Sequence, residues 1–479
     1  MKTDLNDDIF FASIAELGAK LKALEISALD LTNGYCDRLE RLGPRYNALA
    51  LSLREPAIRT ARDIDKELKR GRYKGPLHGI PFAVKDLISV AGEITTGGAR
   101  PYAAQVFSYD ATVVKKLEKA GAILIGKLAM VELAGGGGYN SPNASMLGPG
   151  LNPWDRTRWS GGSSSGSGSA VAAGLVSFAL GSETSGSIVT PSAFCGVTGL
   201  RPTFGLVSRF GAMALSWTLD KIGPMCRTAE DCGLVLRVIA GADDNDPASS
   251  GKSFYYAPQF TREMKDIRVA YAKVDFEEWT EPGTREAFRA ALEVLRNIGV
   301  QLVEAKLPDL PYGAVTNTII SAEGASSFES LIAGGKVEQL ADKRQIEGLK
   351  AAMDIPARDY LKAMRIRRII QQEIRQLLTD NDVILAPART TVAPKINEPL
   401  DRSLSLGDRT PPASQGMQGL IPAGNLAGLP AISLPCGLVG NLPIAVSLVS
   451  RPFTENLILS IGSEYQKRTD WHRRRPNVS

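Results

Sequence analysis

The stretch RWSGGSSSGSGSAVAAGLVSFALGSETSGSIVT, residues 158–190, decides how this sequence is interpreted. Two clusters of glycine and small hydroxyl residues, 161–169 and 181–187, flank an apolar run from Ala170 to Leu180. Small residues at this density let backbone approach a ligand closely and leave N–H groups free to point at it. A flexible linker has a similar composition but lacks an apolar run between two turn-like clusters. The pattern favours a buried site of backbone amides and serine hydroxyls, with a helix and a strand joining its halves.

Length and composition are those of an ordinary globular chain. The 479 residues allow one large core or two medium ones, and 44% are hydrophobic and 22% charged. A net charge of +5 is small for this length and gives no reason to expect nucleic acid as a partner. No window reaches about 18 consecutive apolar residues, and the N-terminus lacks a cationic–apolar signal, so no membrane span is expected. Five scattered cysteines without a C-x-x-C motif are most simply reduced thiols of a cytoplasmic protein.

Only two histidines occur in the chain, His78 in the turn GPLHGIPF and His472 in a basic tail where we expect a surface position. This count nearly excludes a multi-histidine metal site, and a Ser-His-Asp triad would have to use one of the two. We expect structural roles for both. A serine enzyme built on this sequence would therefore take a lysine or a carboxylate as its base.

Helical and strand patterns alternate along the chain, which predicts an α/β fold with a mixed sheet wrapped by helices. The pairs Ser13/Glu16, Ser27/Asp30 and Thr228/Asp231 fit helix N-caps. The polar, turn-rich segment 242–265 is the most plausible internal boundary. We expect helices in 13–42 (two), 56–70, 111–126 (followed there by a strand), 228–241, 282–299, 312–379 and 453–467, strands in 80–84, 267–272, 300–308, 382–388 and 431–437, and a short helix with tight turns in 191–211.

Lys85 stands directly after Ile80 to Val84, an apolar, partly β-branched run that predicts a buried strand. A buried ammonium is costly unless it is partnered, and the alternative is a head group that reaches solvent at the strand end. Because desolvation disfavours the charged form, a buried lysine can be neutral at pH 7 and accept a proton from serine, directly or through a second hydroxyl. The turn that contains Ser187 supplies consecutive N–H groups of the kind an oxyanion hole needs.

Four sequence blocks carry a resemblance to a known family. They are GIPFAVKD (79–86), GGSSSGSGSAVAAG (161–174), GSETSGSIVTPSAFCGVTGLRPTFGLVSR (181–209) and NLAGLPAISLPCG (425–437). In identity, order and spacing they resemble the amidase signature family, over about residues 75–230 and 420–470. The resemblance implies a three-layer α/β/α fold with a mixed central sheet, and hydrolysis of amides through a Ser–cis-Ser–Lys triad.

The resemblance also implies a role for individual residues. Lys85 matches the family's basic lysine, Ser163 the bridging serine at a non-proline cis peptide, and Ser187 the nucleophile. The N–H groups of Thr184, Ser185, Gly186 and Ser187 would form the oxyanion hole. No metal or other cofactor is implied.

Three positions depart from the usual motif of the family. Glu183 replaces an aspartate, and Ser185 replaces a glycine whose position would be strained for serine if φ were positive. Many relatives also carry an arginine two or three residues after the nucleophile, where this chain has Val189 and Thr190. We interpret that loss as favouring a neutral substrate over a carboxylate-bearing one. None of the three changes removes a catalytic group.

The substrate pocket is harder to predict from the sequence. Its expected lining is the glycine-rich loop with Gly135, Gly136, Tyr139 and Asn140, together with Trp217, although core packing is an alternative for both aromatic residues. We expect a single domain over 1–479, with N-terminal helices in 1–72, a core formed by 73–240 and 380–479, and a possible helical lid at about 312–380.

The main hypothesis is an amidase that cleaves a neutral aryl or alkyl amide, acts as a monomer or homodimer, and needs no nucleic acid or membrane. The same machinery could attack a carbamate (urethane) or an ester. A second alternative is the amidase subunit of a glutamine-dependent tRNA amidotransferase. Phosphate binding lacks the G-x-x-x-x-G-K-[ST] order, and a non-catalytic binding protein would show no turnover.

Overall fold

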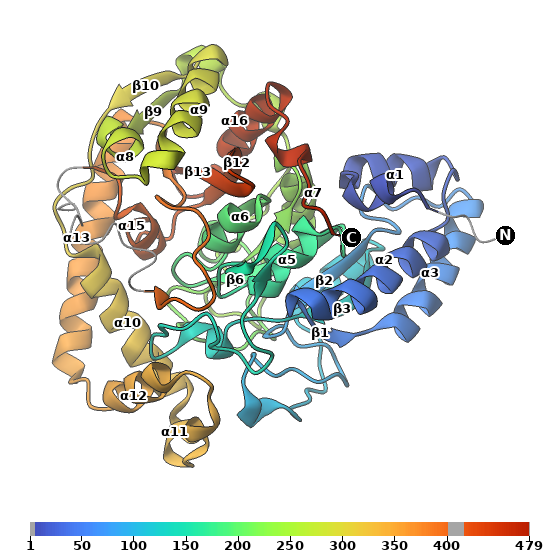
Figure 1. Cartoon of the computed structure of the whole chain (residues 1–479), viewed down its shortest axis with the longest axis horizontal. Helices are drawn as coiled ribbons and strands as arrows, with labels where there is room; N and C mark the ends of the chain where they lie inside the picture. Colours follow the sequence, from blue (N-terminus) through green and yellow to red (C-terminus); the bar gives the residue numbers. More distant parts are fainter. Residues whose placement is uncertain (1–4, 401–415, 479) are drawn as a thin grey trace.

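The computed structural model describes residues 5–400 and 416–478, and its centre is one large mixed sheet (Figure 1). The sheet has 11 strands in the order β1-β3-β2-β6-β8-β7-β12-β13-β11-β9-β10. The strands are β1 (Leu49–Ser52), β2 (Pro81–Lys85), β3 (Ile123–Leu128), β6 (Phe178–Glu183), β7 (Thr198–Arg201), β8 (Lys221–Cys226), β9 (Arg268–Tyr271), β10 (Gln301–Glu304), β11 (Val383–Pro387), β12 (Ala431–Val439) and β13 (Leu442–Ser450), with a separate hairpin of β4 (Leu151–Asn152) and β5 (Asp155–Trp159).

Helices cover both faces of this sheet. Ala445 and Val449 of β13 pack in one hydrophobic cluster with α6 and α15, whereas Val446 and Leu448 pack in another with α7 and α16. Successive residues of a strand face opposite sides, so the chain forms the expected three-layer α/β/α arrangement. The α-helices are α1 (Ile14–Lys22), α2 (Ala28–Leu42), α3 (Arg54–Lys69), α4 (Thr112–Lys119), α5 (Ser165–Ala172), α6 (Val189–Cys195), α7 (Ala229–Ile239), α8 (Lys273–Glu277), α9 (Arg285–Asn297), α10 (Tyr312–Ser327), α11 (Glu329–Ala333), α12 (Lys343–Ala352), α13 (Ala357–Asp380), α15 (Leu420–Leu426) and α16 (Glu455–Lys467).

The three predicted helix caps are all present. Ser13 and Glu16 form a capping box at α1, in which each side chain accepts the N–H of the other residue. Ser27 and Thr228 each accept the N–H three residues further on, at 2.9 and 3.0 Å. These hydroxyls satisfy N–H groups that have no partner within the first helical turn, and so fix where the helices begin.

Several strands were not expected from the sequence. The segment 191–211, predicted as a short helix with turns, contains β7, and β8 and β13 have no counterpart in the predicted strands. β8 has the sequence KIGPMC, whose glycine and proline disfavour a strand by local propensity, and it forms because β6 and β7 pair with it on either side. Pairing with distant strands overrides the local signal there.

Two expectations about position also changed. His472 was expected on the surface but is buried, and its burial lowers its pKa to about 4. The segment 242–265 does not separate two sheets, because β9, which follows it, pairs with β11 in the central sheet. Residues 312–380 are mainly helical, from α10 to α13, and their action as a lid stays a prediction.

Candidate active site

Lys85 is the last residue of β2 and its side chain is completely buried. Its Nζ lies 2.6 Å from Ser163 Oγ and 3.0 Å from Ser182 Oγ. Within the described part of the chain no carboxylate forms an ion pair with it. Burial lowers the pKa of Lys85 to about 7, although the charges of Asp220 and Glu183 act in the opposite direction. The amine is therefore poised between its neutral and charged forms near neutral pH.

Ser163 lies in the loop that leads into α5, and the Gly162–Ser163 peptide is cis, as the resemblance implies. The Ser163 side chain is fully buried, and its carbonyl accepts the Val131 N–H at 3.1 Å. Glycine is required before it, because a Cβ at Gly162 would lie 2.7 Å from Val131 and 2.8 Å from the Trp159 ring. The packing around this loop thus places the Ser163 hydroxyl against Lys85.

Ser187 lies in the turn between β6 and α6, and its carbonyl accepts the Ser164 N–H at 3.3 Å. The structure brings the two serine-rich loops together in this way. Among the described side chains, however, no hydrogen bond joins Ser163 Oγ to Ser187 Oγ. Lys85 is thus hydrogen-bonded to Ser163, whereas the Ser163 and Ser187 hydroxyls are not hydrogen-bonded to each other.

The turn over residues 184–187 has N–H groups that donate to no acceptor among the described residues, which is the property an oxyanion hole needs. Its positive φ falls on Gly186, at 89°, and not on Ser185. Ser185 therefore occupies an ordinary backbone conformation. The replacement of glycine by serine at position 185 introduces no strain in this turn.

Glu183 is completely buried directly beneath the turn. Its Oε2 accepts the N–H groups of Ile188 and Val189 at 2.9 and 3.0 Å, and its Oε1 accepts Arg201 Nη1 at 2.8 Å and Asn425 Nδ2 at 2.9 Å. Burial alone would raise the pKa of this carboxyl, but the Arg201 guanidinium and the hydrogen bonds lower it to about 2. Glu183 is thus an anion that holds the two residues directly after Ser187.

The predicted pocket residues do not all meet in one place. Tyr139 packs against Trp159 and lies beside Gly162, since a Cβ there would be 3.2 Å from the Tyr139 hydroxyl. A Cβ at Gly135 would lie 2.7 Å from the Tyr139 ring, so the loop folds tightly around this side chain.

The other predicted lining residues contact parts of the chain other than Ser163 and Ser187. Gly136 packs against Leu215 and Phe328, and the Asn140 N–H donates to Asp342 at the start of α12. Trp217 is 44% exposed. Contact of Gly135, Gly136, Tyr139, Asn140 and Trp217 with substrate stays a prediction.

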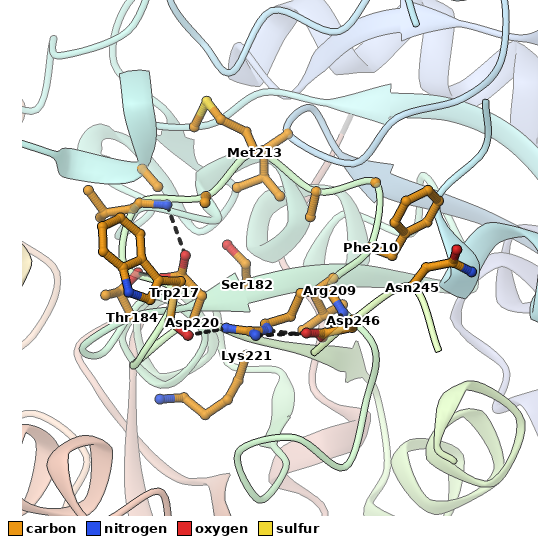
Figure 2. A pocket seen from close by; sticks show the side chains of 17 residues that line it. Ser182, Thr184, Arg209, Phe210, Met213, Trp217, Asp220, Lys221, Asn245 and Asp246 are labelled. Carbon is orange, nitrogen blue, oxygen red and sulfur yellow. Dashed lines mark hydrogen bonds and ion pairs between the residues drawn. The ribbon is translucent and has the colours of Figure 1, made fainter. Parts of the chain in front are cut away.

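A cavity of about 240 Å³ opens beside the site, and the side chains of Met213 and Trp217 surround the space into which the Ser182 hydroxyl points (Figure 2). Because Ser182 contacts Lys85, one hydroxyl separates the buried amine from this cavity. The wall also contains Thr184, whose hydroxyl donates to Asp220 at 2.6 Å. The cavity therefore touches Ser182, which contacts Lys85, and Thr184, the first residue of the turn over residues 184–187.

Sequence reasoning missed three features of the site. It did not assign Ser182 to Lys85, although Ser182 belongs to the second serine-rich cluster. It did not find Arg201 and Asn425 as partners of Glu183, because sheet pairing and α15 bring them there. It also missed Arg389, which donates to the Thr190 hydroxyl in the first turn of α6. The available signal was a cation directly after the apolar run 382–388 that contains β11.

No group of three or more histidine, cysteine, aspartate or glutamate side chains within 5–400 and 416–478 is arranged to hold a metal ion. No helix of the described chain is both long and apolar enough to cross a membrane.

The family model named Amidase matches residues 30–459, most of the chain. The chain belongs to the amidase signature family. A glutamyl-tRNA(Gln) amidotransferase subunit of Carboxydothermus hydrogenoformans is 35% identical to this amidase-family chain over 496 residues, covering 98% of this chain and 100% of the relative.

Solved structures agree with this membership. The peptide amidase of Stenotrophomonas maltophilia has 29% identity and a TM-score of 0.82, with 96% of this chain and 97% of that chain covered. A chain of a complex described as revealing the origins of an s-triazine catabolic enzyme has 30% identity and a TM-score of 0.86, with 95% and 98% covered. This amidase signature chain is therefore an enzyme that acts on amide C–N bonds. It shares its fold with these structures over nearly its whole length.

Loss of the Glu183 charge should destabilise the fold more than loss of an exposed charge. In Glu183→Gln the buried Arg201 loses its anion, so the free energy of unfolding should fall by about 3–5 kcal/mol. Glu183→Asp keeps the charge and should cost less. Urea denaturation followed by circular dichroism measures the change.

A matched control for this prediction is Glu293→Gln, which removes an exposed partner of Arg296 and should cost less than about 1 kcal/mol. Equal losses in Glu183→Gln and Glu293→Gln would contradict a role for Glu183 as the buried anion under the turn.

Proposed function

We propose that this chain hydrolyses an amide through an acyl-enzyme on Ser187, with Ser163 as proton relay and neutral Lys85 as base. The observation that carries the proposal is the 2.6 Å contact between Lys85 Nζ and Ser163 Oγ, formed by a buried amine without an ion-pair partner among the described residues. Serine is a weak nucleophile unless a base is in reach. A lysine whose pKa is lowered to about 7 can act as that base at neutral pH.

The proposed reaction has two stages. Lys85 takes a proton from Ser163, Ser163 takes one from Ser187, and Ser187 Oγ attacks the carbonyl carbon. The N–H groups of residues 184–187 hold the oxyanion, and the proton returns through Ser163 to the leaving amine. Water then cleaves the acyl-enzyme by the same relay in reverse. The open Ser163–Ser187 contact would close in the substrate complex, as catalytic hydrogen bonds often do.

The comparisons support one setting for this chemistry more strongly than the other. Relatives that are subunits of glutamyl-tRNA(Gln) amidotransferases match at 35–36% identity over almost the whole chain, which favours the amidase subunit of a glutamine-dependent amidotransferase. A stand-alone amidase remains the second candidate, because a peptide amidase matches over 96% of the chain. Carbamates and esters also present a carbonyl group with a leaving group, so the same reaction applies to them in either setting.

The preference for a neutral substrate loses its premise. It rested on the absence of an arginine two or three residues after the nucleophile. Thr190, however, accepts hydrogen bonds from Arg389, so a cation stands beside the turn after all. A cytoplasmic location, supported by five free and buried cysteines, and a monomer or homodimer as the stand-alone form stay predictions.

Removal of the nucleophile should abolish turnover and covalent labelling together. Ser187→Ala should hydrolyse amides at least about 10³-fold more slowly and take up no fluorophosphonate probe, because its acyl-enzyme cannot form. Peptide mass spectrometry of the labelled wild type should place the probe on Ser187. The exposed Ser108→Ala is the control and should match the wild type. A label on another serine would exclude this mechanism.

The pH profile should report the state of Lys85. The neutral amine is the active form, so kcat/KM should fall about tenfold per pH unit below a pKa of about 7 and level off above pH 8. Steady-state hydrolysis of a neutral amide between pH 5 and 9 measures this. Lys85→Ala should lose activity without unfolding, and an active Lys85→Ala or a profile flat down to pH 5 would remove Lys85 as base.

The two settings differ in what the purified chain does alone. A stand-alone amidase should hydrolyse simple amides, anilides or carbamates at the same rate with or without other proteins. An amidotransferase subunit should release ammonia from glutamine efficiently only with the other subunits and glutamyl-tRNA(Gln). Ammonia assays with the chain alone and with co-expressed subunits decide between the two.

A further inference from the structure

A second cavity, of about 150 Å³, lies between α6, β11, β13 and α15. Arg389 is one of its lining residues. Two other charged residues are in the wall. Arg201 Nη1 pairs with Glu183 and Asp275 Oδ2 accepts the Met417 N–H, whereas Arg201 Nη2 and Asp275 Oδ1 have no hydrogen-bond partner among the described residues. The rest of the lining is apolar or uncharged, for example Val189, Leu420 and Ile421.

Arg389 has no anionic partner in the part of the chain that the structure describes. Its Nε and Nη2 lie 3.0 and 2.7 Å from a single acceptor, the Thr190 hydroxyl oxygen. A guanidinium has five N–H donors and stays charged in proteins, so three donors remain beyond the two that Thr190 accepts, and Glu183 acts on the charge without direct contact. Asp275 lines the same cavity but forms no ion pair with Arg389. A partly buried cation held only by a neutral hydroxyl has strong capacity for an anion.

The guanidinium adjoins the oxyanion turn. A Cβ at Gly186 would lie 3.3 Å from Thr190 Oγ1 and 3.9 Å from Arg389 Nη2. Gly186 directly precedes Ser187, and consecutive Cα atoms are about 3.8 Å apart. A group a few bonds from a carbonyl bound at Ser187 is therefore within reach of Arg389. Thr190 fixes the guanidinium in this orientation through the first turn of α6.

We propose that Arg389 is a specificity-determining residue that binds a carboxylate of the substrate, so that the preferred substrate is a short amide acid with its carboxylate a few bonds from the scissile carbonyl. The inference rests on the proposed function and defines its substrate class. The planar fork of arginine matches a carboxylate in a bidentate way that lysine does not. Free ω-amide acids and the amino acid glutamine share this chemistry.

Binding to an inactive enzyme tests the inference without turnover. Succinamate and butyramide have the same amide and chain length, but only succinamate carries a carboxylate. Titration calorimetry with Ser187→Ala should show succinamate binding about 10- to 100-fold more tightly than butyramide. The double variant with Arg389→Met should lose this advantage, and Arg389→Lys should keep part of it. Arg375→Met, on an exposed position of α13, is the matched control and should change nothing.

Turnover by enzyme with Ser187 intact separates the inference from the proposed function. Arg389→Met should lower kcat/KM for succinamate about 10- to 100-fold more than it lowers kcat/KM for butyramide. L-glutamine is included in both assays beside succinamate, so that the two sources of substrate, the amino acid and the free ω-amide acid, are compared directly. Arg389→Gln, which is smaller and polar, replaces Arg389→Met if thermal denaturation shows that the latter misfolds.

The outcomes are distinct. Equal binding of succinamate and butyramide, or a preference that survives Arg389→Met, would overturn the inference even if both amides were hydrolysed. Arg389-dependent binding of succinamate, with no hydrolysis of any amide by the wild type either alone or with co-expressed subunits and glutamyl-tRNA(Gln), would support the anion subsite and reject the proposed function.

Discussion

The free-energy cost of a buried positive charge at the end of β2 governs the arrangement of the site. Lys85 meets hydroxyl oxygens rather than carboxylates, so its surroundings favour the neutral amine. The two carboxylates that oppose this effect are directed elsewhere: Glu183 to Arg201 and the turn, and Asp220 to Thr184 and nearby backbone. A carboxylate in direct contact would hold the proton on the amine. The environment thus keeps part of the Lys85 amine in its neutral form near neutral pH.

The proposed triad could be assigned from the sequence because its members lie in local sequence patterns. Lys85 follows an apolar run, and Ser163 and Ser187 stand in two glycine- and serine-rich loops, so their residue types and spacing carry the signal. The supporting residues were not predictable in the same way. Arg201, Asn425 and Arg389 come from β7, α15 and the end of β11, and only the pairing of distant strands places them around one turn.

The same distinction between local and distant signals applies to the elements of the fold. Helices with capping hydroxyls, such as α1 and α7, and apolar strands such as β2 were predictable from local sequence. β8, with its glycine and proline, is a strand because β6 and β7 flank it, which no local pattern records. Glu183 also shows the limit of residue identity. It replaces the aspartate of the family's usual motif, and its carboxylate reaches two backbone N–H groups and two side chains.

The position of β12 between β7 and β13 has a consequence for biosynthesis. Residues 431–439 are synthesised long after β7, yet they bridge β7 to the strands β13 and β11. Asn425, which helps hold Glu183, emerges just before them. A ribosome-bound chain that stops before this point has neither a joined sheet nor the full set of contacts that hold the turn over residues 184–187. Contacts this far apart in sequence form late, so the candidate site is completed only after β12 has been synthesised.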